Sequence, residues 1–120
     1  MVEYLIGSRR ASTVRDVIRA PGAALHIPAL CDVEVTSALR RLLLRGILSE
    51  DRAKDAVADY LDLPLGRHGH QQLLARILSL RTNFSAYDAL AERLGARLVT
   101  GDRSLAQAAQ DHLTVQLVLV

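Results

Sequence analysis

Hydrophobic positions recur at helical spacing through much of the chain and form short uninterrupted runs elsewhere. The clearest helical pattern covers residues 29–45, and we predict a helix there that Gly46 ends in a left-handed conformation. Leu30, Val33, Ser37, Arg40 and Leu44 lie along one stripe of this helix, and Val35, Leu39 and Leu42 lie along its neighbour.

Capping residues and helix breakers divide the remaining chain into short elements. We predict helices that begin near Ser12–Thr13, at Ser49, at Gln71, at Ser85 and at Arg103, and that end before Pro21, before Pro64, at Arg81, at Leu94 and at Gln110. We predict strands over residues 24–27, 63–65, 97–100 and 115–120. Because strands alternate with helices and are apolar throughout, the expected fold is α/β, with a central parallel sheet between two helical layers in one domain over residues 1–120.

Composition narrows the class of protein. Half of the residues are hydrophobic and the net charge is only +2, which is typical of a folded globular protein and does not by itself indicate nucleic-acid binding. Cys31 is the only cysteine, so disulfides and a cysteine-based zinc site are excluded within one chain, and we expect a buried structural thiol. With no signal-peptide pattern and no apolar run of membrane-spanning length, we expect a soluble, cytoplasmic protein.

Three acidic residues stand where an α/β fold builds its site, near the carboxyl ends of strands and the first turns of helices. Glu34 follows the strand that ends at Ile27, Asp88 lies one turn into the helix capped by Ser85, and Asp102 follows the strand that ends at Thr100. If they converge, their oxygens suit Mg²⁺ or Mn²⁺. Acids in first helical turns also occur because they favour the helix dipole, and spacing alone leaves that interpretation ahead.

The segments around these acids resemble the VapC group of PIN-domain proteins. The resemblance rests on Asp32-Val33-Glu34-Val35, on Ser85-Ala86-Tyr87-Asp88-Ala89 and on Thr100-Gly101-Asp102-Arg103-Ser104-Leu105-Ala106, in the order and separations of the family. It covers almost the whole chain and implies a three-layer αβα PIN-like fold.

The resemblance also implies an activity. It implies an Mg²⁺-dependent endoribonuclease, with Mn²⁺ as a possible substitute, that is the toxin of a type II toxin–antitoxin system and is held inactive by a cognate antitoxin. Glu34, Asp88 and Asp102 would be catalytic and metal-binding, Thr100 would help to order the site, and Ser85 would fix the helix that presents Asp88. We expect RNA as substrate, an antitoxin as partner, a homodimer and no membrane association.

The resemblance does not reach the opening of the family pattern, a strand that ends in a metal-binding Asp. Residues 1–7 resemble the helix that follows this strand, so we expect the first strand and its Asp to be missing, and Glu3 does not replace that Asp. Either the true start lies upstream, which we favour, or the chain is truncated and catalytically impaired. The second possibility leaves an alternative function, a PIN-like module that only dimerises or binds antitoxin. A receiver-like regulatory domain is disfavoured because no Lys follows Lys54.

The histidines and a basic helix end are further candidate sites. His68 and His70 lack a third ligand nearby in sequence, so we expect them in a polar surface loop rather than in a zinc site. His26 lies between two apolar residues and is expected to be a strand residue with a hydrogen-bond partner. Arg40, Arg41 and Arg45 form a basic helix end that suits RNA phosphates and equally suits a solvated helix C-terminus.

Overall fold

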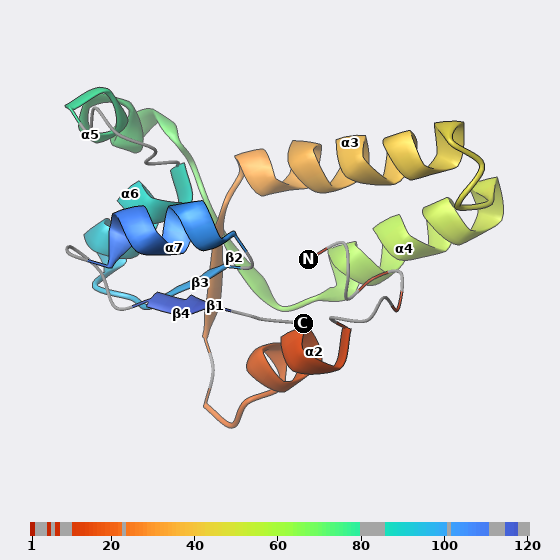
Figure 1. Ribbon diagram of the computed structural model, residues 1–120, viewed down its shortest axis with the longest axis horizontal. Coiled ribbons are helices and arrows are strands. Elements are labelled where there is room, and N and C mark those ends of the chain that lie inside the picture. Colours follow the sequence, from red (N-terminus) through yellow and green to blue (C-terminus); the bar gives the residue numbers. More distant parts are fainter. Residues whose placement is uncertain are drawn as a thin grey trace. The chain divides into compact units, whose positions relative to one another are not determined.

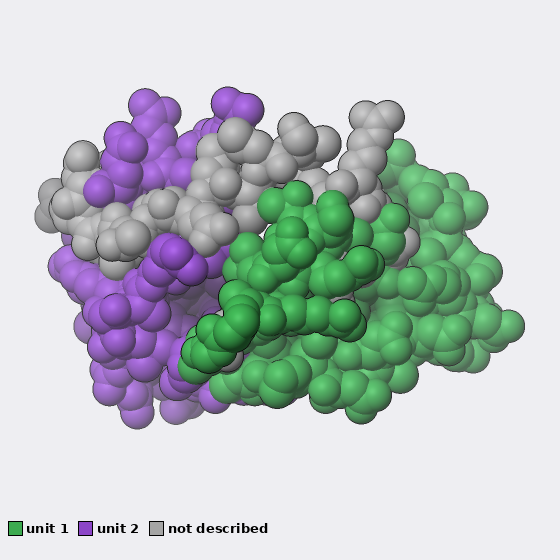
Figure 2. Space-filling model, turned by 90° about the horizontal axis from the view of Figure 1, so that it is seen from below, with its two compact units in different colours: residues 1–25, 31–66, 120 green, residues 26–30, 67–119 purple. Residues whose placement is uncertain are grey.

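The computed structural model describes residues 1, 5, 7, 11–22, 24–79, 86–100, 102–110 and 115–117. These residues divide into two units, which Figure 2 distinguishes by colour. The first unit draws on residues 1–25 and 31–66, and the second on residues 26–30 and 67–119. Each unit is described by itself below.

The first unit is helical. It holds α2 (Ala11–Ile18), most of α3 (Leu30–Leu44) and α4 (Glu50–Asp62), and α3 and α4 form an antiparallel hairpin (Figure 1). The buried residues of α3 are Cys31, Val35 and Leu39, which lie about one turn apart. Those of α4 are Ala53, Ala56 and Tyr60, at the same spacing. These two stripes form the core of the unit, and the buried free thiol of Cys31 confirms the structural role expected for it.

Local signals in the sequence fix the ends of α3 and α4. Gly46 has a φ of 69°, and its N–H donates to the carbonyl of Leu43 at 3.0 Å, which ends α3 as predicted. Ser49 is the N-cap of α4, and its hydroxyl accepts a hydrogen bond of 3.2 Å from the N–H of Arg52. The Arg52 guanidinium in turn donates to the carbonyl of Leu5 at 2.5 Å and ties the start of the chain to α4.

The second unit is mixed. Strands β1 (Leu25–Pro28) and β2 (Leu65–His68) pair with each other, and each begins in the first unit and ends in the second. The chain continues through the 3-10 helix η1 (Gln71–Leu73), α5 (Leu74–Ser79), α6 (Ala86–Leu94), β3 (Leu98–Thr100), α7 (Arg103–Ala109) and β4 (Val115–Leu117). One apolar cluster joins Leu73 to Ala89 and Leu90, with Ile77 packed against it. It holds η1 and α5 on α6.

Strands β3 and β4 run parallel, with Leu98 opposite Val115 and Thr100 opposite Leu117. Helix α7 connects them and packs on both strands (Figure 1), which is the crossover that parallel strands need. Leu98 is buried together with Ala91 of α6 and Ala109 of α7. The α/β class with parallel strand pairing is therefore confirmed. The described strands pair two by two, and the single domain with a missing first strand stays a prediction.

Three local predictions were wrong. The strand expected over residues 63–65 lies at Leu65–His68, because pairing with β1 outweighs the weak strand propensity of its Gly, Arg and His. Leu74 and Leu78, expected to face mostly inward, are 55% and 84% exposed, since α5 is short and only the Leu73–Ile77 side packs on α6. Ser12 and Thr13 lie inside α2 rather than capping it. The predicted cap Ser85 lies outside the described residues.

Candidate active site

Asp88 lies in the first turn of α6 and has no solvent exposure. It is the one charged side chain that is buried in the part of the chain described here. The small residues Ala86, Ala89 and Ala91 let this helix sit deep in the second unit, and Asp88 is carried inward with them. A buried carboxylate is costly unless positive charge or hydrogen-bond donors compensate it, and the start of a helix supplies part of that compensation. Burial thus makes Asp88 the most chemically constrained acid of the unit.

Asp102 lies at the carboxyl end of β3, directly before α7, and its side chain is exposed. Its carbonyl accepts the first hydrogen bond of α7, from the N–H of Ala106 at 2.9 Å. Its N–H donates to the hydroxyl of Thr100 at 3.1 Å. The Thr100 side chain therefore holds the backbone of Asp102 at the end of β3. The position of this backbone determines where the Asp102 side chain starts.

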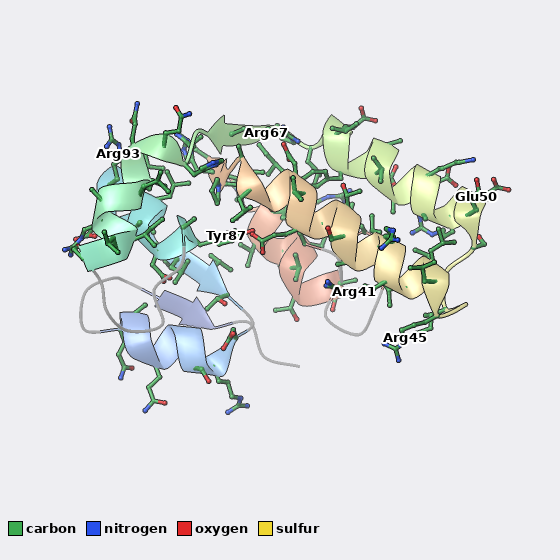
Figure 3. All side chains as sticks on the ribbon, turned by 90° about the horizontal axis from the view of Figure 1, so that it is seen from above. Arg41, Arg45, Glu50, Arg67, Tyr87 and Arg93 are labelled. Atoms are coloured by element: carbon green, nitrogen blue, oxygen red, sulfur yellow. The ribbon has the colours of Figure 1, made fainter. Side chains whose placement is uncertain are left out.

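Asp88 and Asp102 belong to elements that pack on the same strand. Helices α6 and α7 both contact β3, through the cluster of Ala91, Leu98 and Ala109. Tyr87, next to Asp88 in sequence, packs against this cluster (labelled in Figure 3). The second unit thus packs the two helices that carry these acids against one short strand. That the two carboxylates meet at the carboxyl edge of this strand stays a prediction.

Glu34 lies on α3, in the first unit, and is exposed. It is one residue away from Val35 of the buried stripe and points away from the core of that unit. Its convergence with Asp88 and Asp102 stays a prediction. Within either unit, the described residues include no group of three or more His, Cys, Asp or Glu side chains placed to hold a metal ion. The donor chemistry of the three carboxylates, all hard oxygen ligands, does fit Mg²⁺ or Mn²⁺.

Sequence reasoning missed the partner of Asp32, which stands two residues before Glu34. The Tyr60 hydroxyl donates a hydrogen bond of 2.5 Å to Asp32 Oδ1. Burial raises the pKa of Tyr60, and the hydrogen bonds to Asp32 and Cys31 raise it further. Asp32 is thus occupied in joining α3 to α4. No signal in the sequence links residues 28 positions apart in this way.

The two imidazoles of His26 and His68 form a second feature that the sequence did not indicate. His26 Nδ1 lies 2.8 Å from His68 Nε2. The expected hydrogen-bond partner of His26 is therefore confirmed. The surface-loop prediction was wrong for His68, which is the last residue of β2, whereas His70 does lie in an exposed turn. The signal that could have found the pair is one histidine in each of two short strand segments.

Arginines mark the surfaces of both units. Arg40 and Arg41 in the C-terminal half of α3 and Arg45 just beyond its end are exposed, and Figure 3 labels Arg41 and Arg45. In the second unit, Arg76 of α5 makes two hydrogen bonds of 2.8 Å to the two carboxylate oxygens of Glu92 on α6. The first set is free to meet an anionic ligand, whereas the guanidinium of Arg76 is engaged in holding α5. Over the described residues, no helix has the length and apolar character needed to cross a membrane.

Comparison with known proteins finds bacterial ribonucleases that are similar to this chain in sequence. The chain is similar to ribonuclease VapC12 of Mycobacterium tuberculosis, with 36% identity over 121 residues that cover 98% of this chain and 92% of the relative. Ribonuclease VapC9 of the same organism is 38% identical over 78% of this chain and 77% of its own length. Ribonuclease VapC3 is 39% identical over 84% and 75%. No family model matches the chain.

Proposed function

This chain belongs to the VapC family of PIN-domain ribonucleases, and we propose that it is an Mg²⁺-dependent endoribonuclease, the toxin of a type II toxin–antitoxin pair. The observation that carries the proposal is the similarity to VapC ribonucleases along 98% of the chain. It is supported by the buried Asp88 and by Asp102 at the end of β3, both on elements packed around one strand. Glu34 on α3 is proposed as the third acid.

The carboxylates are proposed to hold the metal and to orient the attacking water. A bound Mg²⁺ or Mn²⁺ supplies Lewis-acid polarisation of a phosphate and a lowered pKa for water at that position. Asp88, fixed by burial, would give a rigid ligand, and Asp102, exposed at the start of α7, would face the substrate side. Thr100 would keep Asp102 in place through its hydrogen bond to the Asp102 N–H. Such a site works mainly by positioning charge where it develops.

The substrate is proposed to be held by arginines as well as by the acidic site. Arg40, Arg41 and Arg45 are exposed on one helix, and guanidinium groups bind phosphate with two parallel hydrogen bonds. Contacts of this kind hold RNA without reading its sequence, because they go to phosphates. We therefore expect their loss to weaken RNA binding uniformly across sequences and to lower its salt dependence.

A protein partner is proposed to cover the exposed apolar stripe of α3. Leu30, Val33 and Leu44 of that stripe are exposed, although they are large and hydrophobic. A surface of this kind on a small protein is typical of an interaction site. We propose that the antitoxin binds here when present, and that the chain forms a homodimer. We place the protein in the cytoplasm, where an RNA substrate is found.

The test is RNA cleavage by the purified chain with Mg²⁺, with Mn²⁺ and with EDTA. Asp88→Asn, Asp102→Asn and Glu34→Gln remove one negative charge each while keeping size. Asp59→Asn is the matched control, since Asp59 is an exposed acid on α4. We expect cleavage to require the metal and all three acids but not Asp59. Metal-independent cleavage, or full activity in Asp88→Asn, would rule out this centre. A chain that binds antitoxin but cleaves no RNA would instead favour a binding module.

A further inference from the structure

The imidazoles of His26 and His68 bring two nitrogen atoms to one point at the surface of the second unit. The nitrogens are 2.8 Å apart, while the ring centroids are 5.0 Å apart and the ring planes are tilted by 51°. The rings therefore meet edge to edge rather than stacking, and each directs a nitrogen at the other. The acidic site uses neither residue.

The backbone holds this pair in place. His26 lies in β1 and His68 in β2, which pair with each other. The N–H of Ala29 donates to the carbonyl of His68 at 2.7 Å, so the hydrogen bonding between these segments reaches the pair itself. Side chains alternate along a strand, and His26 is exposed whereas the next residue, Ile27, is buried. The two rings are thus positioned by strand pairing and are open to solvent on one side.

Neutral imidazoles that face each other at this distance share one proton, because one ring donates and the other accepts. A divalent transition metal can bind both nitrogens in place of that proton, from a position beside the line that joins them. The donating ring then moves its proton to its outer nitrogen, so both rings stay neutral and both inner lone pairs face the metal. Neutral imidazole is a preferred ligand of nickel, copper and zinc ions, and a poor one for Mg²⁺.

The distance selects among these metals. Two metal–nitrogen bonds of about 2.0–2.1 Å place the nitrogens about 2.9 Å apart at a right angle, and about 3.3 Å apart at the tetrahedral angle. The observed 2.8 Å is close to the right-angle spacing, so the two nitrogens need not move apart, and each ring has only to turn until its lone pair points at the metal rather than at the other nitrogen. We infer that His26 and His68 form a two-histidine site for a divalent transition metal of tetragonal geometry, such as Ni²⁺ or Cu²⁺, with water in the remaining positions.

The nearest charge in sequence is Arg67. It precedes His68 in β2, and alternation along the strand directs it to the opposite face from the His68 ring. His70 lies two residues beyond His68, in the turn before η1, and is exposed. It provides a matched control, because it is a histidine of the same segment that is not part of the pair.

The inference is tested by calorimetric titration of the tag-free chain with NiCl₂ at about pH 8, where imidazole is neutral. The variants are His26→Gln and His68→Gln, which keep a hydrogen-bonding side chain, and the control is His70→Gln. We expect one Ni²⁺ per chain, at least about tenfold weaker binding in either pair variant because the second ligand no longer binds within the same molecule, and less than about twofold change in the control. Zn²⁺ should bind more weakly than Ni²⁺, and Mg²⁺ should not compete.

Unchanged Ni²⁺ affinity in His26→Gln would overturn the inference, and so would an equal loss in His70→Gln, which would assign binding to His68 and His70. The Cu²⁺ complex of the unmodified chain gives a second readout, which does not depend on whether any variant folds. Its electron paramagnetic resonance spectrum is expected to show two nitrogen ligands in a tetragonal field, and a spectrum with fewer than two would also overturn the inference. None of these outcomes depends on ribonuclease activity.

Discussion

Tyr60 of α4 donates a 2.5 Å hydrogen bond to the carboxylate of Asp32 in the first turn of α3. Tyr60 is buried, and Asp32 is half-buried at the edge of the same core. The bond joins the end of one helix to the beginning of the other, so the α3–α4 hairpin is closed at its open end as well as by its connecting loop.

Tyr60→Phe removes the donor and leaves the ring. We expect the free energy of unfolding to fall by about 1–2 kcal/mol, the scale of a lost hydrogen bond to a charged group. Chemical denaturation followed by circular dichroism measures the change. Asp59→Asn, an exposed change on the same helix, should stay within about 0.5 kcal/mol of the unmodified chain. If Tyr60→Phe lowers the free energy of unfolding by less than about 0.5 kcal/mol, the hydrogen bond to Asp32 does not stabilise the fold.

Alkaline pH should destabilise the fold through Tyr60. Burial, together with Asp32 and Cys31, raises the pKa of Tyr60 in the folded state above the value of about 10 that it has when unfolded. The folded state then keeps a proton that the unfolded state releases, so this contribution is complete below about pH 10 and declines as pH rises further. Unfolding measured from pH 8 to 11 should show the decline. Tyr60→Phe should show a shallower decline, and equal slopes would contradict the assignment.

The ion pair of Arg76 with Glu92 should govern the docking of α5. Two hydrogen bonds join the groups, but both side chains are partly exposed, so we expect an effect on local opening rather than on global stability. Arg76→Lys keeps the positive charge but cannot make the two parallel hydrogen bonds to the Glu92 carboxylate. Faster amide hydrogen exchange in α5 is expected, and added salt should reproduce it. The exposed pair of Lys54 with Glu50 is the control, and its loss should leave α5 unchanged.

Both acids of the second unit should be needed for cleavage. Asp102→Asn is expected to raise the Mg²⁺ concentration needed for half-maximal cleavage and to lower kcat/KM by about 100-fold or more, the scale of charged catalytic groups. Asp88→Asn should cause a similar loss of activity with little loss of stability, because the amide has the size of the carboxylate and costs less to bury than a charge. Strong destabilisation by Asp88→Asn would assign Asp88 to the fold rather than to the chemistry.

The exposed stripe of α3 gives a prediction about association. Val33→Glu places a charge in the stripe, and Leu61→Glu places the same charge on α4 at nearly equal exposure, 64% against 63%. We expect Val33→Glu to weaken antitoxin binding at least about tenfold, because a charge would be buried without a partner, and Leu61→Glu to leave it unchanged. Calorimetry and light scattering measure both. Equal effects would place the antitoxin elsewhere.

Helices were predicted best where local rules decide. The left-handed Gly46, the Ser49 cap and the stripe of Val35 and Leu39 act within a few residues, and α3 and α4 form as these signals indicate. Gly95, with a φ of 61°, ends α6 in the same way. The order of β3, α7 and β4 was predicted because two apolar runs, residues 97–100 and 115–120, lie on either side of a helix with a polar start.

Predictions failed where a partner distant in sequence decides. Strand β2 contains Gly66 and two basic residues, and only its pairing with β1 makes it a strand. The same pairing places His68 against His26 rather than beside His70. Leu78 is exposed because only part of α5 packs on α6, and helical periodicity alone cannot predict how much of a helix is covered. The candidate acids were found through their place at helix starts and through family resemblance, while the burial of Asp88 required the packed unit.

The division of β1 and β2 between distant parts of the chain has a consequence for biosynthesis. A ribosome completes β1 (Leu25–Pro28) and must then add residues 29–64 before the first residue of β2 exists, a delay of roughly 2–7 s at common translation rates. Until β2 follows, the backbone groups of β1 have no partner strand, and the apolar Leu25 and Ile27 have no cover from it. The α3–α4 hairpin needs only partners close in sequence, whereas His26 meets His68 only once β2 is present. Closure of the histidine pair therefore waits for β2, and the pair is present only in chains in which β1 has found its own partner strand.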